Sequence, residues 1–163
     1  MMMKNWQKWI NGFLIFLLLI IGISGYIFIK AQSPLKSGKE EAFAIAKKEA
    51  GIISPEKFYL YHGTETYYVV VGQAKNKKKK IVWIPENKKR GISVKALNSG
   101  ISESEAIQKV LNEKNIQQIL AARLGMEKDI PIWEVSYLDQ DDHLNYYYIH
   151  FETGEWWRKI KNL

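Results

Sequence analysis

The sequence predicts an α+β protein, in which an N-terminal transmembrane helix is followed by two α-β-β-β units with antiparallel sheets. Three observations support this prediction: a charge-free apolar run near the N-terminus, a helix-capping motif that occurs twice, and three β-type segments after each copy of the motif. The chain has 163 residues, no cysteine and a formal net charge of +7. This length leaves room for the helix and about one further domain, which excludes a large multidomain enzyme.

The transmembrane helix is predicted over residues 10–29, which contain no charged side chain. A helix needs about 20 apolar residues to cross a hydrocarbon core of about 30 Å. Trp6 and Trp9 precede this run and Tyr26 lies near its end, where aromatic rings settle at the level of the lipid headgroups. A cleaved signal peptide is the alternative, but its apolar core is usually shorter and ends in small residues, whereas residues 26–30 are bulky. We therefore expect an uncleaved anchor.

The orientation of this anchor is predicted from residues 1–9, the short tail before the helix. The tail carries Lys4 and Lys8, which is usual for the cytoplasmic end of a signal anchor. We expect the tail to be cytoplasmic and the rest of the chain to lie outside the cell membrane, as in a single-pass protein. Residues 30–38, which contain a proline and a glycine, are expected to form a linker.

Two Ser-x-x-Glu motifs predict the starts of two helices. They are Ser37 with Glu40, and Ser102 with Glu105, so the second copy follows the first by 65 positions. In this capping box the hydroxyl and the carboxylate satisfy backbone donors at a helix start. Apolar residues at three- and four-residue spacing follow each motif, and the helices are expected to end at Gly51 and Asn115.

Three segments rich in aromatic and branched residues follow each predicted helix. They cover residues 58–62, 66–72 and 81–85 after the first helix, and 116–124, 132–138 and 145–151 after the second. Tyr67-Tyr68 and Ile132-Trp133 are 65 residues apart, and Trp83-Ile84 and Ile149-His150 are 66 apart. We therefore predict two repeats, residues 39–98 and 99–163. Because about 60 residues bury little surface alone, each helix should pack on its own antiparallel sheet and the repeats should share an interface.

The second repeat resembles a PepSY domain, a small cystatin-like fold. The resemblance rests on Trp133-Glu134-Val135, then Tyr148-Ile149, then Thr153-Gly154-Glu155, preceded by a capped helix. His150-Phe151 stands where that family often has Asp-Ala. The resemblance covers most of residues 100–163.

The whole arrangement of tail, anchor, basic Tyr-Tyr-Val-Val unit and PepSY-like unit resembles the family of cell wall elongation regulator TseB-like proteins. The resemblance implies a non-enzymatic extracytoplasmic regulator of peptidoglycan elongation in a Gram-positive cell, which acts by binding a penicillin-binding transpeptidase in the membrane. Other PepSY proteins resemble peptidase propeptides or guards of lytic enzymes. An inhibitor or chaperone of an exported peptidase or lytic cell-wall hydrolase is therefore the alternative.

The residue patterns predict no catalytic, cofactor or metal site. The histidines lack paired ligand spacing, and the serines lie in no nucleophile motif. Asp139, Asp141 and Asp142 lack the glycine and the distant glutamate of a calcium loop, so a solvated turn is expected there.

Five lysines lie between two predicted strands, where a hairpin tip should project: Lys75, Lys77, Lys78, Lys79 and Lys80. One interpretation is a solvated loop. The other is electrostatic binding to anionic lipid headgroups or to an anionic wall polymer, to which each lysine contributes about 1 kcal/mol. Nucleic acid is disfavoured because the domain is expected to be exported and no stacking aromatics interleave the run.

Charge is unevenly distributed, with 14 basic against 6 acidic residues over 31–99 and 7 against 11 over 100–163. The first part is thus +8 and the second −4. Opposite charges favour docking of the repeats on each other, and the alternative is that the acidic repeat meets a basic partner.

Aromatic residues near the C-terminus predict a contact surface for a partner. Strand residues alternate between faces, so some of Tyr146, Tyr147, Tyr148, Trp156 and Trp157 should be exposed. Tyr146, Trp156 and Trp157 are the expected contact residues, since exposed Tyr and Trp are common interface anchors. Alternatively, these rings cover the helix and fill the seam between the repeats.

Overall fold

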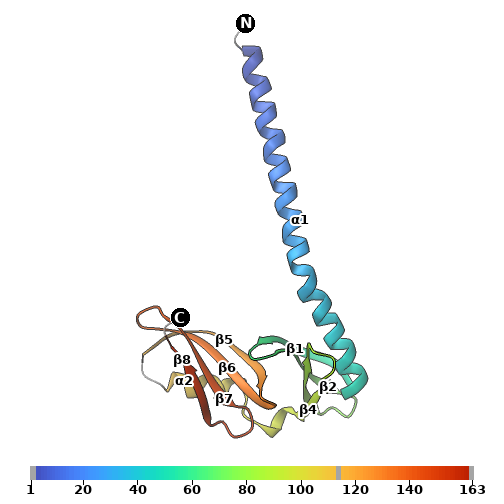
Figure 1. Ribbon diagram of the computed structural model, residues 1–163, viewed down its shortest axis with the longest axis vertical. Helices are drawn as coiled ribbons and strands as arrows, with labels where there is room; N and C mark the ends of the chain where they lie inside the picture. Colours follow the sequence, from blue (N-terminus) through green and yellow to red (C-terminus); the bar gives the residue numbers. More distant parts are fainter. Residues whose placement is uncertain (1–2, 113–114, 162–163) are drawn as a thin grey trace. The chain divides into compact units, whose positions relative to one another are not determined.

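The computed structural model describes residues 3–112 and 115–161, which form two helices, a 3-10 turn and eight strands (Figure 1). The elements are α1 (Met3–Ala50), β1 (Ile52–His62), β2 (Thr66–Ala74), β3 (Lys79–Pro85), β4 (Ser93–Ala96), η1 (Leu97–Ser99), α2 (Glu103–Leu111), β5 (Ile116–Glu127), β6 (Ile130–Asp139), β7 (Leu144–His150) and β8 (Trp156–Ile160). The chain divides into two compact parts, residues 1–38 and 39–163.

The first compact part contains the apolar stretch of α1. Trp9–Phe28 spans 20 residues with a mean hydropathy of 2.3, and none of it is buried. By length and composition this stretch can cross a membrane. Its uniform exposure is compatible with a single-pass anchor, because a core helix would bury its apolar side chains against protein.

Residues 30–38, which are predicted to form a linker before a separate helix, are themselves helical, because α1 continues through them to Ala50; the two compact parts do divide after residue 38. Ser37 therefore lies inside a helix, and the first capping motif does not begin one. Starting a helix is costly whereas extending one is not, so a short segment between two strongly helical stretches tends to continue the helix. Pro34 removes one backbone hydrogen bond, at a cost of about 3 kcal/mol, without ending it.

In the first repeat, α1 packs on one face of a sheet with strand order β1-β2-β3-β4, in which all neighbours are antiparallel. Three alanines one turn apart let the helix approach closely. The buried cluster between helix and sheet consists of Ala42, Ala46, Ala50, Ile52, Val70, Val82 and Ile84. Gly51 ends the helix as predicted, with a φ of +70° that favours glycine.

The second repeat has the same design, with α2 beside a sheet of order β5-β6-β7-β8. Its predicted capping box is confirmed. The Ser102 hydroxyl accepts a 3.2 Å hydrogen bond from the Glu105 amide, and the Glu105 carboxylate accepts a 2.7 Å bond from the Ser102 amide. The helix ends at Leu111 with Asn112 as its C-cap, rather than at Asn115 as predicted.

The two sheets confirm the predicted repetition and correct its detail. Tyr68 pairs with Ile84 in the first sheet, and Trp133 pairs with Ile149 in the second. Trp133 follows Tyr68 by 65 positions, and Ile149 follows Ile84 by the same number. The offset of 66 predicted for the last of the three segments in each repeat is therefore one residue too long. Each sheet also has a fourth strand, β4 or β8, which the three predicted segments per repeat omit.

The predicted interface between the repeats is present as a second buried cluster. The Trp83 indole nitrogen donates a 2.9 Å hydrogen bond to the Gly125 carbonyl, and the Trp83 ring meets Phe151 edge-on at 5.8 Å. Tyr59 meets Trp133 in the same way at 6.0 Å. The face of the first sheet that turns away from α1 therefore packs on the second repeat.

Candidate partner-binding surface

The second sheet has one face that turns away from α2. Trp133 marks the α2 face, because its indole nitrogen donates a 3.0 Å hydrogen bond to the carbonyl of Ile101, just before that helix. Glu134 follows Trp133 and so points the opposite way. Glu134 pairs with Tyr148, which pairs with Arg158. Since directly opposed residues share a face, these three side chains form a row across β6, β7 and β8.

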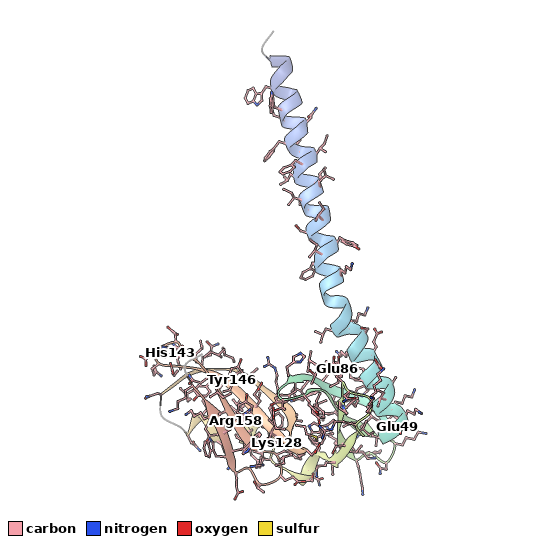
Figure 2. The ribbon with its side chains drawn as sticks, in the orientation of Figure 1. Glu49, Glu86, Lys128, His143, Tyr146 and Arg158 are labelled. Carbon is pink, nitrogen blue, oxygen red and sulfur yellow. The ribbon has the colours of Figure 1, made fainter. Side chains whose placement is uncertain are left out.

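Aromatic rings and an arginine stack on this row. The Arg158 guanidinium carbon lies 4.4 Å from the centroid of the Tyr148 ring, in a cation–π contact. Trp157 meets Tyr148 edge-on at 6.3 Å and lies 5.9 Å from the His150 ring. Arg158, labelled in Figure 2, belongs to β8 and is exposed. Tyr148 itself is only 5% exposed and supports the others from below. We call Tyr148, His150, Trp157 and Arg158 the aromatic–arginine surface, of which the last three are accessible.

The three predicted contact residues do not all lie on this surface. Tyr146 is two residues before Tyr148 in β7, so it shares that face, where it is half-buried (Figure 2). Trp156 pairs with Ile149 and therefore faces the other way, with 59% of its surface exposed. Tyr146 and Trp157 thus share one face of the sheet, whereas Trp156 is a separate exposed ring at the edge strand.

A buried carboxylate supports the aromatic–arginine surface. Glu134 is 7% exposed, and its carboxylate lies 3.5 Å from the Arg123 guanidinium. Burial raises the pKa of Glu134, although hydrogen bonding from Tyr148 and the charge of Arg123 oppose this. Burial, with the charge of Glu134, raises the pKa of Tyr148 to about 12, so its hydroxyl remains protonated at neutral pH.

Sequence reasoning missed Arg123, Glu134 and Arg158 as parts of this surface. One signal was available, because Glu134 is the single charged residue between apolar neighbours in a predicted strand. Such a residue must either face solvent or have partners. The arginines gave no signal of their own, since cross-strand neighbours depend on a register that sequence alone does not specify.

The seam between the repeats is closed by a second buried carboxylate, Glu127, which is 2% exposed. It accepts hydrogen bonds from the Tyr61 hydroxyl at 2.8 Å, the Thr64 amide at 2.9 Å and the Thr64 hydroxyl at 2.6 Å. Burial alone would raise the pKa of Glu127, but the bonds from Thr64 and Tyr61 outweigh it and lower the pKa. The carboxylate is therefore ionised and structural at neutral pH.

Ion pairs also cross the seam, and each has its basic partner in the first repeat and its acidic partner in the second. They are Lys57 with Glu103, Arg90 with Asp129, and Lys95 with Glu152. These contacts agree with the docking interpretation of the uneven charge. Because their side chains are partly exposed, each pair contributes about 0–1 kcal/mol, so they direct the docking more than they stabilise it.

A groove of about 820 Å³ opens at the seam. Its floor includes Tyr59, Val71, Leu124 and Trp133, and both members of the Lys57–Glu103 ion pair line it. The Tyr59 hydroxyl also donates a 3.0 Å hydrogen bond to Glu103. The groove thus has an apolar floor and a rim whose charges are largely neutralised.

The five predicted lysines divide into two groups. Lys75, Lys77 and Lys78 lie in the turn between β2 and β3 and are exposed, as predicted for a hairpin tip. Lys79 and Lys80 instead belong to β3: Lys79 makes a 2.7 Å ion pair with Glu56, and the Lys80 ammonium donates a 2.9 Å hydrogen bond to the Ala50 carbonyl. Only the first three project as a tip.

The aspartates between β6 and β7 form a turn. Asp139 accepts hydrogen bonds from the amides of Asp141 and His143, at 3.1 and 3.0 Å, and from the Asn145 side chain at 3.0 Å. These bonds, that of Asn145 foremost, lower the pKa of Asp139. Ligand atoms of Asp139, Asp141 and His143 come within 4.8 Å of one another. The turn itself accounts for this cluster, because both Asp139 oxygens are already engaged.

The fold and this surface define a class of protein: an α+β protein with two repeats, in which a long N-terminal apolar helix precedes a PepSY-type second repeat. Residues 41–85 match the family model of the cell wall elongation regulator TseB-like domain, and residues 100–155 match that of the peptidase propeptide and YPEB (PepSY) domain.

A named relative and a solved structure, both from Bacillus subtilis, extend this similarity over most of the chain. The chain is 33% identical over 141 residues to a protein of strain 168 named probable cell wall elongation regulator TseB. The aligned region covers 86% of this chain and 88% of that protein. A solved structure, the YpmB protein, is 34% identical with a TM-score of 0.70, over 76% of this chain and 97% of that one. The chain belongs to the family of cell wall elongation regulator TseB-like proteins.

Proposed function

We propose that this protein is a membrane-anchored, extracytoplasmic binding protein without enzymatic activity, and that it regulates cell-wall elongation by contacting a penicillin-binding transpeptidase in the same membrane. The regulatory role is proposed from the name of the B. subtilis relative, and the single-pass topology from the apolar stretch Trp9–Phe28. The transpeptidase is the partner that the family resemblance implies.

The aromatic–arginine surface is the observation that carries the binding role. Trp, Tyr and Arg dominate binding hot spots, because they bury large areas at little cost in side-chain entropy. Arg158 is exposed and lies over the Tyr148 ring, so its guanidinium is held at the surface of this face. No helix covers this face among the described residues of the second repeat, since the contacts of α2 are with β5 and β6 on the other side.

Anchoring makes a modest surface sufficient. Two proteins confined to one membrane meet at a high effective concentration, so a weak interface can still be occupied. Regulation by contact also requires no catalytic groups, which agrees with the structural use of Glu127 at the seam and of Asp139 in its turn.

Photo-crosslinking in cells tests the proposal. A photoreactive amino acid is placed at position 158 of the full-length protein, and the matched control carries it at Lys89, an exposed residue of the first repeat. We expect position 158 to capture a penicillin-binding transpeptidase and position 89 to capture little of it. Equal capture from both positions, or capture of none, contradicts the proposal.

A second candidate function is inhibition or chaperoning of an exported peptidase or lytic cell-wall hydrolase. The match of residues 100–155 to the peptidase propeptide and YPEB model favours it. The same experiment separates the two, because recovery of hydrolases or peptidases from position 158, without any transpeptidase, supports this second function and overturns the first.

A further inference from the structure

We infer that the end of the first repeat around the β2–β3 turn binds a soluble phosphate-bearing polyanion outside the membrane. This inference rests on the proposed extracytoplasmic location. It concerns a different face from the aromatic–arginine surface, so a polymer and a protein partner could be bound together.

The turn itself supplies three exposed positive charges. The Ala74 amide donates to the Lys78 carbonyl, and the Lys77 amide donates to the Ala74 carbonyl, both at 2.9 Å. This closes a tight turn in which Lys77 takes a φ of +62°. The ammonium groups of Lys75, Lys77 and Lys78 form no ion pair with any residue that the structure describes. They are therefore free to meet anions from solvent.

The end of α1 adds more positive charge beside the turn. Lys80 is bonded to the Ala50 carbonyl, and Ile52 pairs with Ala74, so the last turn of α1 adjoins the hairpin. Lys47 and Lys48 lie in that last turn and are exposed.

The charge at this end of the repeat is strongly positive. The seven lysines are Lys47, Lys48, Lys75, Lys77, Lys78, Lys79 and Lys80. Two carboxylates lie among these lysines. Glu49, which is labelled in Figure 2, pairs with Lys48 at 3.1 Å. Glu56 pairs with Lys79. Seven positive and two negative charges leave a net charge of +5. We call this group the lysine end.

The form of the lysine end fits a polymer better than a single small anion. Its free ammonium groups are exposed and spread over a turn and a helix end, although Lys78 also lines the groove. Lysine is a compact point charge that binds phosphate without fixed geometry, which suits a chain of repeated phosphates. The nearby groove is less suited to an anion than the turn, because as many carboxylates as lysine ammonium groups line it.

The lysine end lies away from the residue that connects the second compact part to the membrane helix. The part of α1 that belongs to the second compact part begins at Lys39, directly after residues 1–38, and ends at Ala50, beside the lysine end. Eleven residues at about 1.5 Å each separate these points by about 17 Å. The lysine end therefore lies at the opposite end of this segment from the point of attachment.

Polyanion binding by the full-length chain in phosphatidylcholine nanodiscs tests this inference. The probes are fluorescent inorganic polyphosphate and vesicles that contain phosphatidylglycerol. The variant K75Q/K77Q/K78Q is compared with K89Q/K128Q/K161Q, which removes the same charge from three other exposed lysines. We expect the first variant to weaken polyphosphate binding on the order of tenfold or more, and the second by less than about threefold. Binding should vanish near 1 M salt, where the screening length is about 3 Å.

Two results would overturn the inference. Equal weakening by both triple variants would mean that only net charge matters. Loss of vesicle binding in K75Q/K77Q/K78Q with unchanged polyphosphate binding would assign the lysine end to the membrane. Unaltered circular dichroism checks that both variants are folded. Polyphosphate binding is measured without any transpeptidase. A failure to bind polyphosphate would therefore leave the crosslinking test of the proposed function at position 158 unaffected.

Discussion

The Tyr61 hydroxyl donates a 2.8 Å hydrogen bond to Glu127, and this bond joins β1 of the first repeat to β5 of the second. Both side chains are almost fully buried, at 1% and 2% exposure. Two glycines make room for the contact. A Cβ at Gly63 would lie 1.9 Å from the Glu127 carboxylate, and one at Gly125 would lie 2.5 Å from the Tyr61 ring. A buried, charge-assisted contact thus holds the arrangement of the two sheets.

Removal of the Tyr61 hydroxyl should destabilise the protein. Y61F removes a hydrogen bond to a buried carboxylate, and we expect the free energy of unfolding to fall by about 1–3 kcal/mol. Urea unfolding of the full chain in neutral detergent, followed by the fluorescence of the buried tryptophans, measures it. Y68F is the control, because the Tyr68 hydroxyl makes only an exposed 3.5 Å contact with Glu86. Equal losses in the two variants would show that the Tyr61–Glu127 bond has no special weight.

Stability should fall in acid because of Glu127. Its pKa is lower in the folded protein than the ordinary 4.5, so its ionisation stabilises the fold above about pH 4.5. That contribution is lost as the pH falls through the lowered folded pKa. We expect E127Q to be less stable at pH 7 and to lose less on acidification, as measured by urea midpoints from pH 7 to 3.

The raised pKa of Glu134 acts with the opposite sign and provides a check. Ionisation of Glu134 costs stability, so the fold gains from this group below its ordinary pKa and loses that gain as the pH rises through the raised folded pKa. On acidification, E134Q should therefore lose more stability than the unsubstituted protein, whereas E127Q should lose less. Parallel pH profiles for the two variants would contradict this assignment.

A methyl group at Gly125 should disturb the seam. G125A places a carbon within 2.5 Å of the Tyr61 ring, which is buried and cannot move away, and we expect a loss of about 1–3 kcal/mol. G91A is the matched control, since a Cβ at Gly91 meets nothing within 4 Å. Thermal unfolding followed by near-ultraviolet circular dichroism compares them. A neutral G125A would mean that the repeats can shift relative to each other.

The capping box of α2 should contribute measurably to stability. S102A removes the hydroxyl that accepts from the Glu105 amide, and we expect a cost of about 1 kcal/mol. S104A lies in the first turn of the same helix and should change stability by less than about 0.5 kcal/mol. Urea unfolding of both variants measures the difference, and a comparable loss in S104A would show that the cap itself is not responsible.

Ser102 and Ser37 illustrate what local sequence can predict. Both precede a glutamate by three residues, but only Ser102 begins a helix. The motif describes the bonds available at a helix start, whereas the existence of that start depends on whether the preceding residues are already helical. The lysine run gives the same lesson, because Lys78 and Lys79 are adjacent and identical, yet only Lys79 has an ion-pair partner.

The short edge strands were not predictable in the same way as the central ones. β4 has 4 residues and β8 has 5, and each pairs with a neighbour on one side only. None of their residues is fully buried, so they carry little of the apolar pattern that marks a strand in the sequence. The aromatic–arginine surface depends on β8, which is why Tyr146 and Trp157 could be proposed from sequence while their division from Trp156 could not.

The sequence by itself determined the apolar helix, the order of helices and strands, the near-constant repeat offset and the uneven charge, because each depends on residue type and short-range spacing. Only the tertiary structure decided the continuity of α1, the burial of Glu127 and Glu134, the partners of Lys79 and Lys80, and the stacking of Arg158 on Tyr148. The physical reason is that these features join residues distant in the chain, and their geometry depends on strand register and on the packing of one repeat against the other.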